Sequence, residues 1–188
     1  MRMDKVGIKS WKELKQGKPS QELELLEDID GEFEKIPWLF DFFKGKLNGN
    51  GHAIRNVILT DCIFDDGQRL ALFPYMSHAV IQNIKFENII IDVDKGAYTP
   101  KIAGLCVEAY KSNIENVSVE MSTMDKEQIP LIKELTCSTI VQTEYYCNGR
   151  DAPLYEYKMD PDGQEQTWDE KNTINKRKDY SNHEDAKH

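Results

Sequence analysis

The stretch FFKGKLNGNGHAIRNVIL, residues 42–59, places three glycines within seven residues and then changes at once to the pattern I-x-N-V-x-L. The glycines do not fit a dinucleotide-binding fingerprint, because Ile54 stands where the third glycine belongs and a β-rich run follows. The Gly-Lys-Ser/Thr ending of a Walker loop is absent as well. We therefore interpret Gly45, Gly49 and Gly51 as tight corners with positive φ that lead into a coil of strands.

The I-x-N pattern recurs along the chain. It begins at Ile54, Ile81 and Ile114, which are 27 and then 33 residues apart, and Leu72 and Leu105 keep the 33-residue register upstream. The first, fourth and sixth positions of each copy are apolar and their neighbours are mostly polar, as in a strand with one buried face. These inward positions are Ile54, Val57, Leu59, Ile81, Ile84, Phe86, Ile114, Val117 and Val119. Repeated strands at this spacing predict a solenoid.

Each copy carries an asparagine at its third position, namely Asn56, Asn83 and Asn116. An amide both donates and accepts, so identical asparagines stacked at a strand spacing of about 4.8 Å form a hydrogen-bonded ladder. We predict that these three residues form one structural ladder, each at a bend between short strands. A row of ligand-binding amides is the functional alternative.

The run F-K-G-K-L-N-G-N-G-H-A-I-R-N-V resembles the opening signature of right-handed parallel β-helix proteins with GLUG-type repeats. ALFPYMSHAVIQNI and IAGLCVEAYKSNIENV are similar to the coils that follow it in that family. The resemblance covers residues 10–121 and implies an all-β fold, a short right-handed parallel β-helix (solenoid). It implies little about function, because such repeats occur on adhesins and on protease ancillary domains. Cys106 and Val107 depart from the family, since the second glycine of its GLxG step belongs there.

The chain divides into an N-terminal helical cap, β-helix coils, a C-terminal strand and hairpin cap, and a polar tail expected to be disordered: residues 1–20, 21–125, 126–158 and 159–188. Ser10 and Glu13 form a capping box for a short N-terminal helix. The Asn148-Gly149 pair, between β-rich runs, predicts a two-residue β-hairpin.

Composition restricts the partners. The 188 residues carry a formal net charge of −9, which argues against direct nucleic-acid binding, since that affinity comes mainly from Lys and Arg. The start, MRMDKVGIKSW, has no apolar signal segment, and no run approaches the roughly 20 apolar residues of a membrane span. The four cysteines form no CxxC pair, so we expect no metal site, disulfide framework or cofactor. A cytoplasmic protein without a membrane partner is expected.

Charged candidates for chemistry are few. Asp65, Asp66 and Arg69, with His78 on the next coil, come nearest to the charged face of β-helix enzymes that cleave acidic polysaccharides. The DDGQR segment is also a good turn, and turn chemistry alone explains it. We expect no catalytic residue.

The DVD segment offers Asp92 and Asp94 as two oxygen ligands for calcium. Two ligands do not make a site, and a solvated turn is the alternative.

Aromatic residues near the C-terminus are candidates for a binding patch. Tyr145 and Tyr146 are adjacent, and Tyr155 and Tyr157 are expected to share a face on the return strand of the hairpin. Tyrosine is enriched at protein interfaces, although these rings would also serve to close the end of a solenoid. Trp168, in the polar tail, either docks on the body or anchors a partner.

These observations predict a non-catalytic acidic β-solenoid that binds another protein, encoded by a bacterium, a phage or a mobile element. One alternative is an inhibitor of a nucleic-acid-handling enzyme that acts by charge mimicry. Another is a carbohydrate-binding or carbohydrate-degrading β-helix, which needs aromatic rings and carboxylates along one face. A homodimer through an uncapped end is also open.

Overall fold

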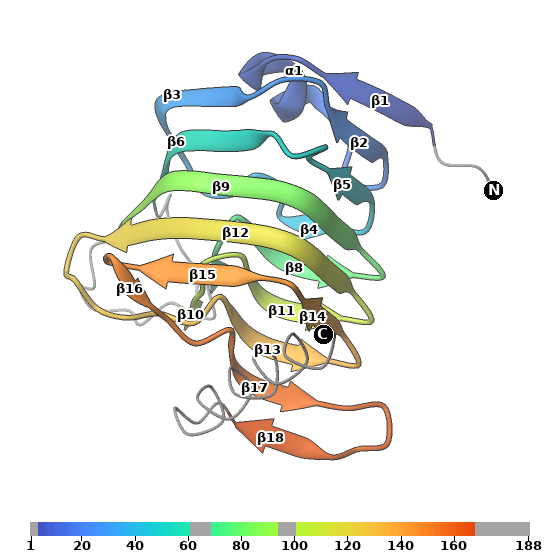
Figure 1. The fold of residues 1–188 in the computed structure, drawn as a ribbon, viewed down its shortest axis with the longest axis vertical. Helices are drawn as coiled ribbons and strands as arrows, with labels where there is room; N and C mark the ends of the chain where they lie inside the picture. The colour runs from blue at the N-terminus through green and yellow to red at the C-terminus, as the bar shows by residue number, and fades with distance from the viewer. Residues whose placement is uncertain (1–3, 61–68, 94–100, 168–188) are drawn as a thin grey trace, which may run out of the picture.

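The computed structural model describes residues 4–60, 69–93 and 101–167, and these are folded mostly into β-strands (Figure 1). The predicted all-β fold is confirmed. A ten-stranded sheet contains β1 (Lys5–Ile8), β2 (Glu22–Leu25), β3 (Ile29–Ile36), β5 (Lys46–Asn48), β6 (Ala53–Thr60), β9 (Val80–Asp92), β12 (Asn113–Thr123), β14 (Thr139–Val141), β15 (Glu144–Cys147) and β16 (Arg150–Asp151). A six-stranded sheet contains β4 (Phe42–Phe43), β8 (Phe73–Ser77), β11 (Cys106–Tyr110), β13 (Ile132–Thr136), β17 (Tyr155–Met159) and β18 (Glu165–Thr167). β7 (Arg69–Leu70) and β10 (Lys101–Ile102) form a two-stranded sheet.

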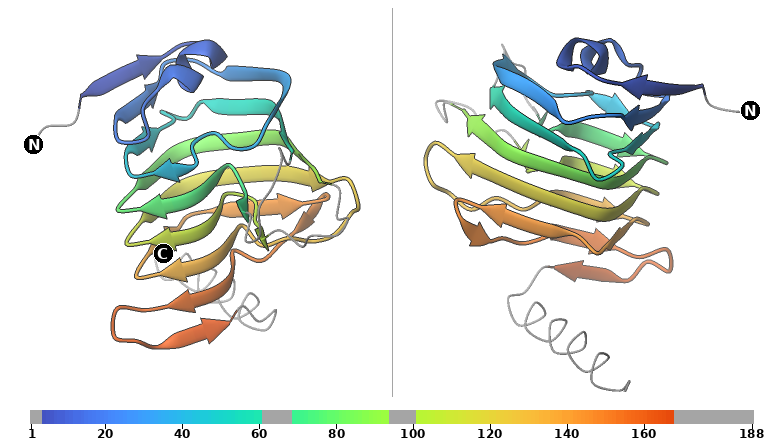
Figure 2. Two further views of the ribbon diagram at one scale, coloured as in Figure 1. Left: turned by 180° about the vertical axis from the view of Figure 1, so that it is seen from behind. Right: turned by 45° about the horizontal axis from the view of Figure 1, so that its top comes forward.

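The chain passes back and forth between the sheets, so that β8, β9, β10, β11 and β12 lie in the six-, ten-, two-, six- and ten-stranded sheets in turn. Each pass pairs with the one before it in parallel, for example β12 with β9 and β11 with β8. In the described segments, the antiparallel pairs are β15 with β16 and β17 with β18, both at the C-terminal end. Figure 2 shows the six-stranded sheet on the side opposite β3, β6, β9, β12 and β15.

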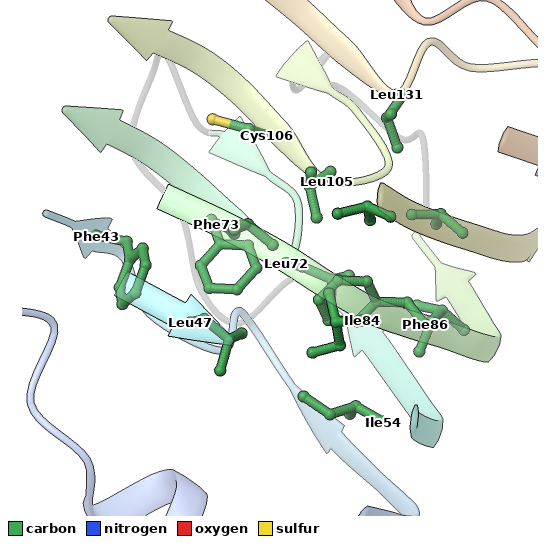
Figure 3. Close-up of a cluster of buried hydrophobic side chains, with 14 of the residues drawn as sticks. Phe43, Leu47, Ile54, Leu72, Phe73, Ile84, Phe86, Leu105, Cys106 and Leu131 are labelled. Carbon is green, nitrogen blue, oxygen red and sulfur yellow. The ribbon is translucent and has the colours of Figure 1, made fainter. Parts of the chain in front are cut away.

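The core lies between the two larger sheets and is lined by the predicted inward residues (Figure 3). All nine predicted positions are at most 1% exposed, which confirms this part of the pattern. The ring of Phe73 contacts side chains of both larger sheets. Its centroid lies 5.2 Å from that of Phe43 on β4 and 6.2 Å from that of Phe86 on β9.

The register of the first copy of the repeat differs from the prediction. Ile81 pairs with Ile114 as expected, but its partner on the other side is Leu47, and Ile54 pairs with Phe86. The alignment of Ile54 with Ile81 is therefore wrong. The I-x-N pattern marks two different bends, and β9 contains both of them, at Asn83 and Asn88, each with positive φ.

The asparagines accordingly form two rows. Asn116 donates to Asn83 over 3.0 Å, as predicted, and Asn83 donates to Asn48 over 3.2 Å. Asn56 does not belong to this ladder. It donates to both carboxylate oxygens of Asp30 at 3.1 Å and accepts from Asn88 at 2.8 Å. The φ angles of 52° to 57° at Asn56, Asn83, Asn88 and Asn116 are ones that Asn tolerates better than most residues.

The three glycines of the opening stretch have two distinct roles. Gly51 has a φ of 85° and is the tight corner that we predict. Gly45 and Gly49 are not in the positive-φ region, so that part of the prediction is wrong. A Cβ on Gly45 would collide with the carbonyl oxygen of Gln21, and one on Gly49 would collide with that of Asn83.

The predicted N-terminal helix is confirmed as α1 (Trp11–Gln16), and it lies beside β3. The hydroxyl of Ser10 accepts a hydrogen bond from the Glu13 backbone N–H over 3.2 Å. The Glu13 carboxylate reaches back to the N–H of Lys9 at 2.7 Å. The indole N–H of Trp11 donates to Glu34 on β3 over 2.6 Å, which joins the helix to that strand.

The predicted hairpin at Asn148-Gly149 is confirmed, because both residues have positive φ and Cys147 pairs with Arg150. Its return strand is only β16, so Tyr155 and Tyr157 lie elsewhere, on β17 of the six-stranded sheet. Residues 160–167 were expected to be part of a disordered tail, but they form a turn and β18. The rest of the predicted tail, 168–188, lies outside the described residues.

Candidate functional site

The sequence candidates are only partly described by the structure. Asp65, Asp66, Asp94 and Trp168 lie outside the described residues. Asp92 ends β9 and its carboxylate accepts from Lys35 over 3.1 Å. The ammonium group of Lys35 thus occupies one oxygen of a carboxylate that the sequence offered only as a candidate calcium ligand.

The C-terminal tyrosines, which the sequence offered either as a binding patch or as rings that close the end of the solenoid, divide between the core and the surface. Tyr145 and Tyr155 are 3% and 6% exposed and belong to the core, whereas Tyr146 is 38% exposed. The reason is the strand register. Tyr145 pairs with the inward residue Val119, and Tyr155 pairs with the inward residue Ile132.

Arg69 leads to a different cluster. It was expected near His78, but His78 lies against Tyr110, with ring centroids 5.7 Å apart. The guanidinium group of Arg69 contacts Glu108 through two nitrogens, at 2.6 and 2.7 Å from one carboxylate oxygen. It also lies 4.7 Å from the ring centroid of Tyr75. The side chain of Arg69 therefore reaches from β7 of the two-stranded sheet to residues of the six-stranded sheet.

This cluster continues as a row across the sheet, which we call the aromatic–charged strip. Phe42 pairs with Tyr75, Tyr75 with Glu108, Glu108 with Glu134, and Glu134 with Tyr157, each on the next strand. Parallel pairing in register puts successive side chains about 4.8 Å apart. The strip consists of these residues and two cations from the two-stranded sheet: Phe42, Tyr75, Glu108, Glu134, Tyr157, Arg69 and Lys101.

The centre of the strip is a chain of ion pairs. Lys101 lies 2.8 Å from a carboxylate oxygen of Glu134 and 3.9 Å from one of Glu108, which also binds Arg69. Burial raises the pKa of Glu108, but hydrogen bonds from Tyr75 and Arg69 outweigh it, so the pKa lies below its ordinary value. The hydrogen bond to Glu134 raises the pKa of Lys101. The lowered pKa of Glu108 and the raised pKa of Lys101 favour the charged forms of these two groups at neutral pH.

Aromatic rings stand at both ends of the strip. Phe42 is 45% exposed, and its ring centroid lies 5.8 Å from that of Tyr75. A hydrogen bond to Glu108, together with burial, raises the pKa of Tyr75. Burial and a hydrogen bond to Glu165 raise the pKa of Tyr157. Nearby carboxylates thus favour the neutral form of both phenols.

Glu108 is not suited to the role of a general acid. A general acid needs a carboxyl that holds its proton near neutral pH, and Glu108 has a lowered pKa. Charged side chains fixed by mutual hydrogen bonds, with aromatic rings on either side, form a preorganised contact surface.

Two further findings concern the described segments. No helix there is long and apolar enough to cross a membrane. Within the same ranges, no group of three His, Cys, Asp or Glu side chains is arranged to hold a metal ion.

Most of the strip was missed in the sequence, although one signal pointed to it. The 33-residue offset that aligns Leu72 with Leu105 also aligns Tyr75 with Glu108, three positions further on. Glu134 follows Glu108 after a shorter interval, so no constant period reveals it. In a single sequence, charged residues of a binding surface also cannot be distinguished from ordinary solvent-exposed charged residues.

Comparison of the chain with protein-family models, with curated proteins and with solved structures finds no match in any of the three.

Proposed function

We propose that the chain is a short right-handed parallel β-helix. Parallel pairing of β8 with β11, of β11 with β13, and of β9 with β12 supports this. So does the hydrogen bond between Asn83 and Asn116, which are 33 residues apart. The antiparallel pairs at the C-terminal end would be caps that stop further strands from adding.

On this scaffold we propose a non-catalytic function: the chain binds another protein through the aromatic–charged strip. The supporting observation is the in-register row from Phe42 to Tyr157, with its charges fixed by mutual contacts. Tyr, Phe and Arg are enriched at protein interfaces, and the strip contains all three. A rigid sheet also presents such residues with little loss of conformational entropy on binding.

The test compares two tyrosines on opposite sheets. Immobilised wild-type chain is incubated with nuclease-treated lysate of its own host, alongside the variants Tyr75→Ala in the strip and Tyr146→Ala on β15. Retained proteins are quantified by mass spectrometry. We expect a partner that Tyr75→Ala loses and Tyr146→Ala keeps. Equal retention by all three forms would refute a role for the strip.

Carbohydrate binding is a second candidate, and one observation favours it. Aromatic rings and carboxylates do lie along one face, as a carbohydrate-binding β-helix requires. Isothermal titration with neutral and acidic oligosaccharides distinguishes the two functions. Saturable binding of a sugar that Tyr75→Ala abolishes would favour this candidate over a protein partner.

Charge mimicry has weaker support at the strip. A nucleic-acid mimic presents carboxylates free to meet a basic site, whereas Glu108 and Glu134 contact Arg69 and Lys101. The salt dependence of partner retention decides the matter, because mimicry predicts a steep loss as salt rises.

A further inference from the structure

We propose that the ligand of the strip is an uncharged, proline-rich segment of a partner protein in the polyproline II conformation. This inference rests on the proposed function, since it specifies which part of a protein partner the strip contacts. Three features of the strip carry it: its length and direction, its hydrogen-bond donors and its charge balance.

The strip is narrow and runs across the strands. Its five in-register residues, from Phe42 on β4 to Tyr157 on β17, span four strand spacings, or about 19 Å. A polyproline II helix rises about 3.1 Å per residue, so about six residues cover this length. Such a helix already has an extended conformation and loses little entropy on binding.

The strip contacts its ligand through side chains, because the strands beneath it use their backbone groups for pairing with one another. A proline-rich segment offers carbonyl oxygens as acceptors and lacks the N–H of each proline. Arg69 carries five N–H donors and Lys101 three, more than their contacts with Glu108 and Glu134 use. Counted against the residues that the structure describes, these spare donors match the free carbonyls, and the aromatic rings match proline rings.

Charge complementarity selects an uncharged ligand. The strip has two cations and two carboxylates within 2.8 Å of one another in pairs, Arg69 with Glu108 and Lys101 with Glu134. The two pairs balance each other, so neither an acidic nor a basic ligand gains a net attraction from them, and an uncharged ligand leaves both intact. The net charge of −9 disfavours acidic ligands further.

The same charges disfavour a second copy of the chain on this face. A two-fold axis through the centre of the strip would bring the central carboxylates, Glu108 and Glu134, close to the carboxylates of the other copy. Like charges facing each other in an interface are unfavourable.

The test is fluorescence anisotropy with labelled oligoprolines that are shorter than, equal to and longer than the strip. A glycine–serine peptide of matched length and a neutral oligosaccharide serve as competing ligands. We expect affinity to rise with length and to level off at about six residues. Tyr75→Ala and Tyr157→Ala should each weaken binding by about tenfold or more, while Tyr146→Ala on the other sheet leaves it unchanged.

Equal binding of the glycine–serine peptide, absence of oligoproline binding, or equal affinity of all three variants would overturn the inference. Circular dichroism spectra confirm that each variant is folded. Capture of a host protein that depends on Tyr75, together with no oligoproline binding, would overturn this inference alone and leave the proposed function intact. Binding of the oligosaccharide but not of oligoproline would overturn both.

Discussion

At Gly49 and Gly51 the same residue type meets two different requirements. Gly49 lies where backbone of the next pass comes close, so any Cβ would meet the Asn83 carbonyl and the Ile84 side chain. Gly51 has open space around it, but its φ of 85° is unfavourable for residues with a side chain. The requirement is steric at one position and conformational at the other.

Alanine substitutions separate these two requirements. We expect Gly49→Ala to lower the free energy of unfolding by about 2 kcal/mol or more, because the backbone of β9 has to move. Gly51→Ala should cost about 1 kcal/mol, the penalty for a left-handed conformation. Urea denaturation followed by circular dichroism measures both. A larger loss in the free energy of unfolding for Gly51→Ala than for Gly49→Ala would contradict the steric role of Gly49 and the conformational role of Gly51.

Tyr145 carries a hydroxyl that is buried without a hydrogen-bond partner in the described structure. Burial raises the pKa of this phenol, which stays neutral at every physiological pH. Removing an unsatisfied buried polar group is neutral or favourable. We therefore expect Tyr145→Phe to leave the free energy of unfolding unchanged or to raise it by up to about 1 kcal/mol. A decrease of similar size in the free energy of unfolding would show that the Tyr145 hydroxyl does form a hydrogen bond in the folded protein.

At the scale of elements, the polar rows at the bends hold successive strands in register. In the first row, Asn83 both donates to Asn48 and accepts from Asn116. Asp30 ends the second row, where its carboxylate accepts from Asn56. Its pKa is lowered mainly by the Glu32 backbone N–H and also by Asn56.

The position of a residue within a row should set the cost of removing it. Asn83→Ala loses two side-chain hydrogen bonds and Asn116→Ala loses one, while both residues have the same φ of 52°. We expect Asn83→Ala to be the more destabilising by about 1 kcal/mol in urea denaturation. Equal costs would mean that the φ angle, and not the ladder, accounts for these asparagines.

The ion pairs of the strip should make stability depend on pH. The folded-state pKa of Glu108 lies below its ordinary value of 4.5. The ionised carboxylate therefore contributes to the free energy of unfolding above pH 4.5, and this contribution is lost as the pH falls through the folded-state pKa. We expect the stability difference between wild type and Glu108→Gln to shrink from about pH 5 downward. Glu156→Gln, in an exposed pair with Lys133, is the control and should show little difference at any pH. A constant difference for Glu108→Gln would contradict the lowered pKa.

At the scale of the whole molecule, the sequence predicts the scaffold better than the surface. The apolar first, fourth and sixth positions of the repeat identified buried residues such as Ile84 and Val117, because burial on one face imposes a pattern on the sequence. The register of Ile54 was wrong because two kinds of bend share the same three-residue pattern. Whether Tyr145 and Tyr155 form a surface patch or close the core stayed open in the sequence, because a single sequence does not show which of two neighbouring strand residues lies inward.

The strip depends on contacts between distant parts of the chain. Arg69 is 39 residues from Glu108, and Lys101 is 33 from Glu134. Only the folded stack brings these residues together, so no local pattern predicts the strip.

The central claim is that the strip is the binding face, and photo-crosslinking tests it most directly. A photoreactive amino acid replaces Phe42 in the strip or Tyr146 on β15, two positions of similar exposure at 45% and 38%. Each variant is irradiated in host lysate. The account predicts a specific crosslinked partner from position 42 and none from position 146. A partner crosslinked from position 146 and not from position 42 would contradict it.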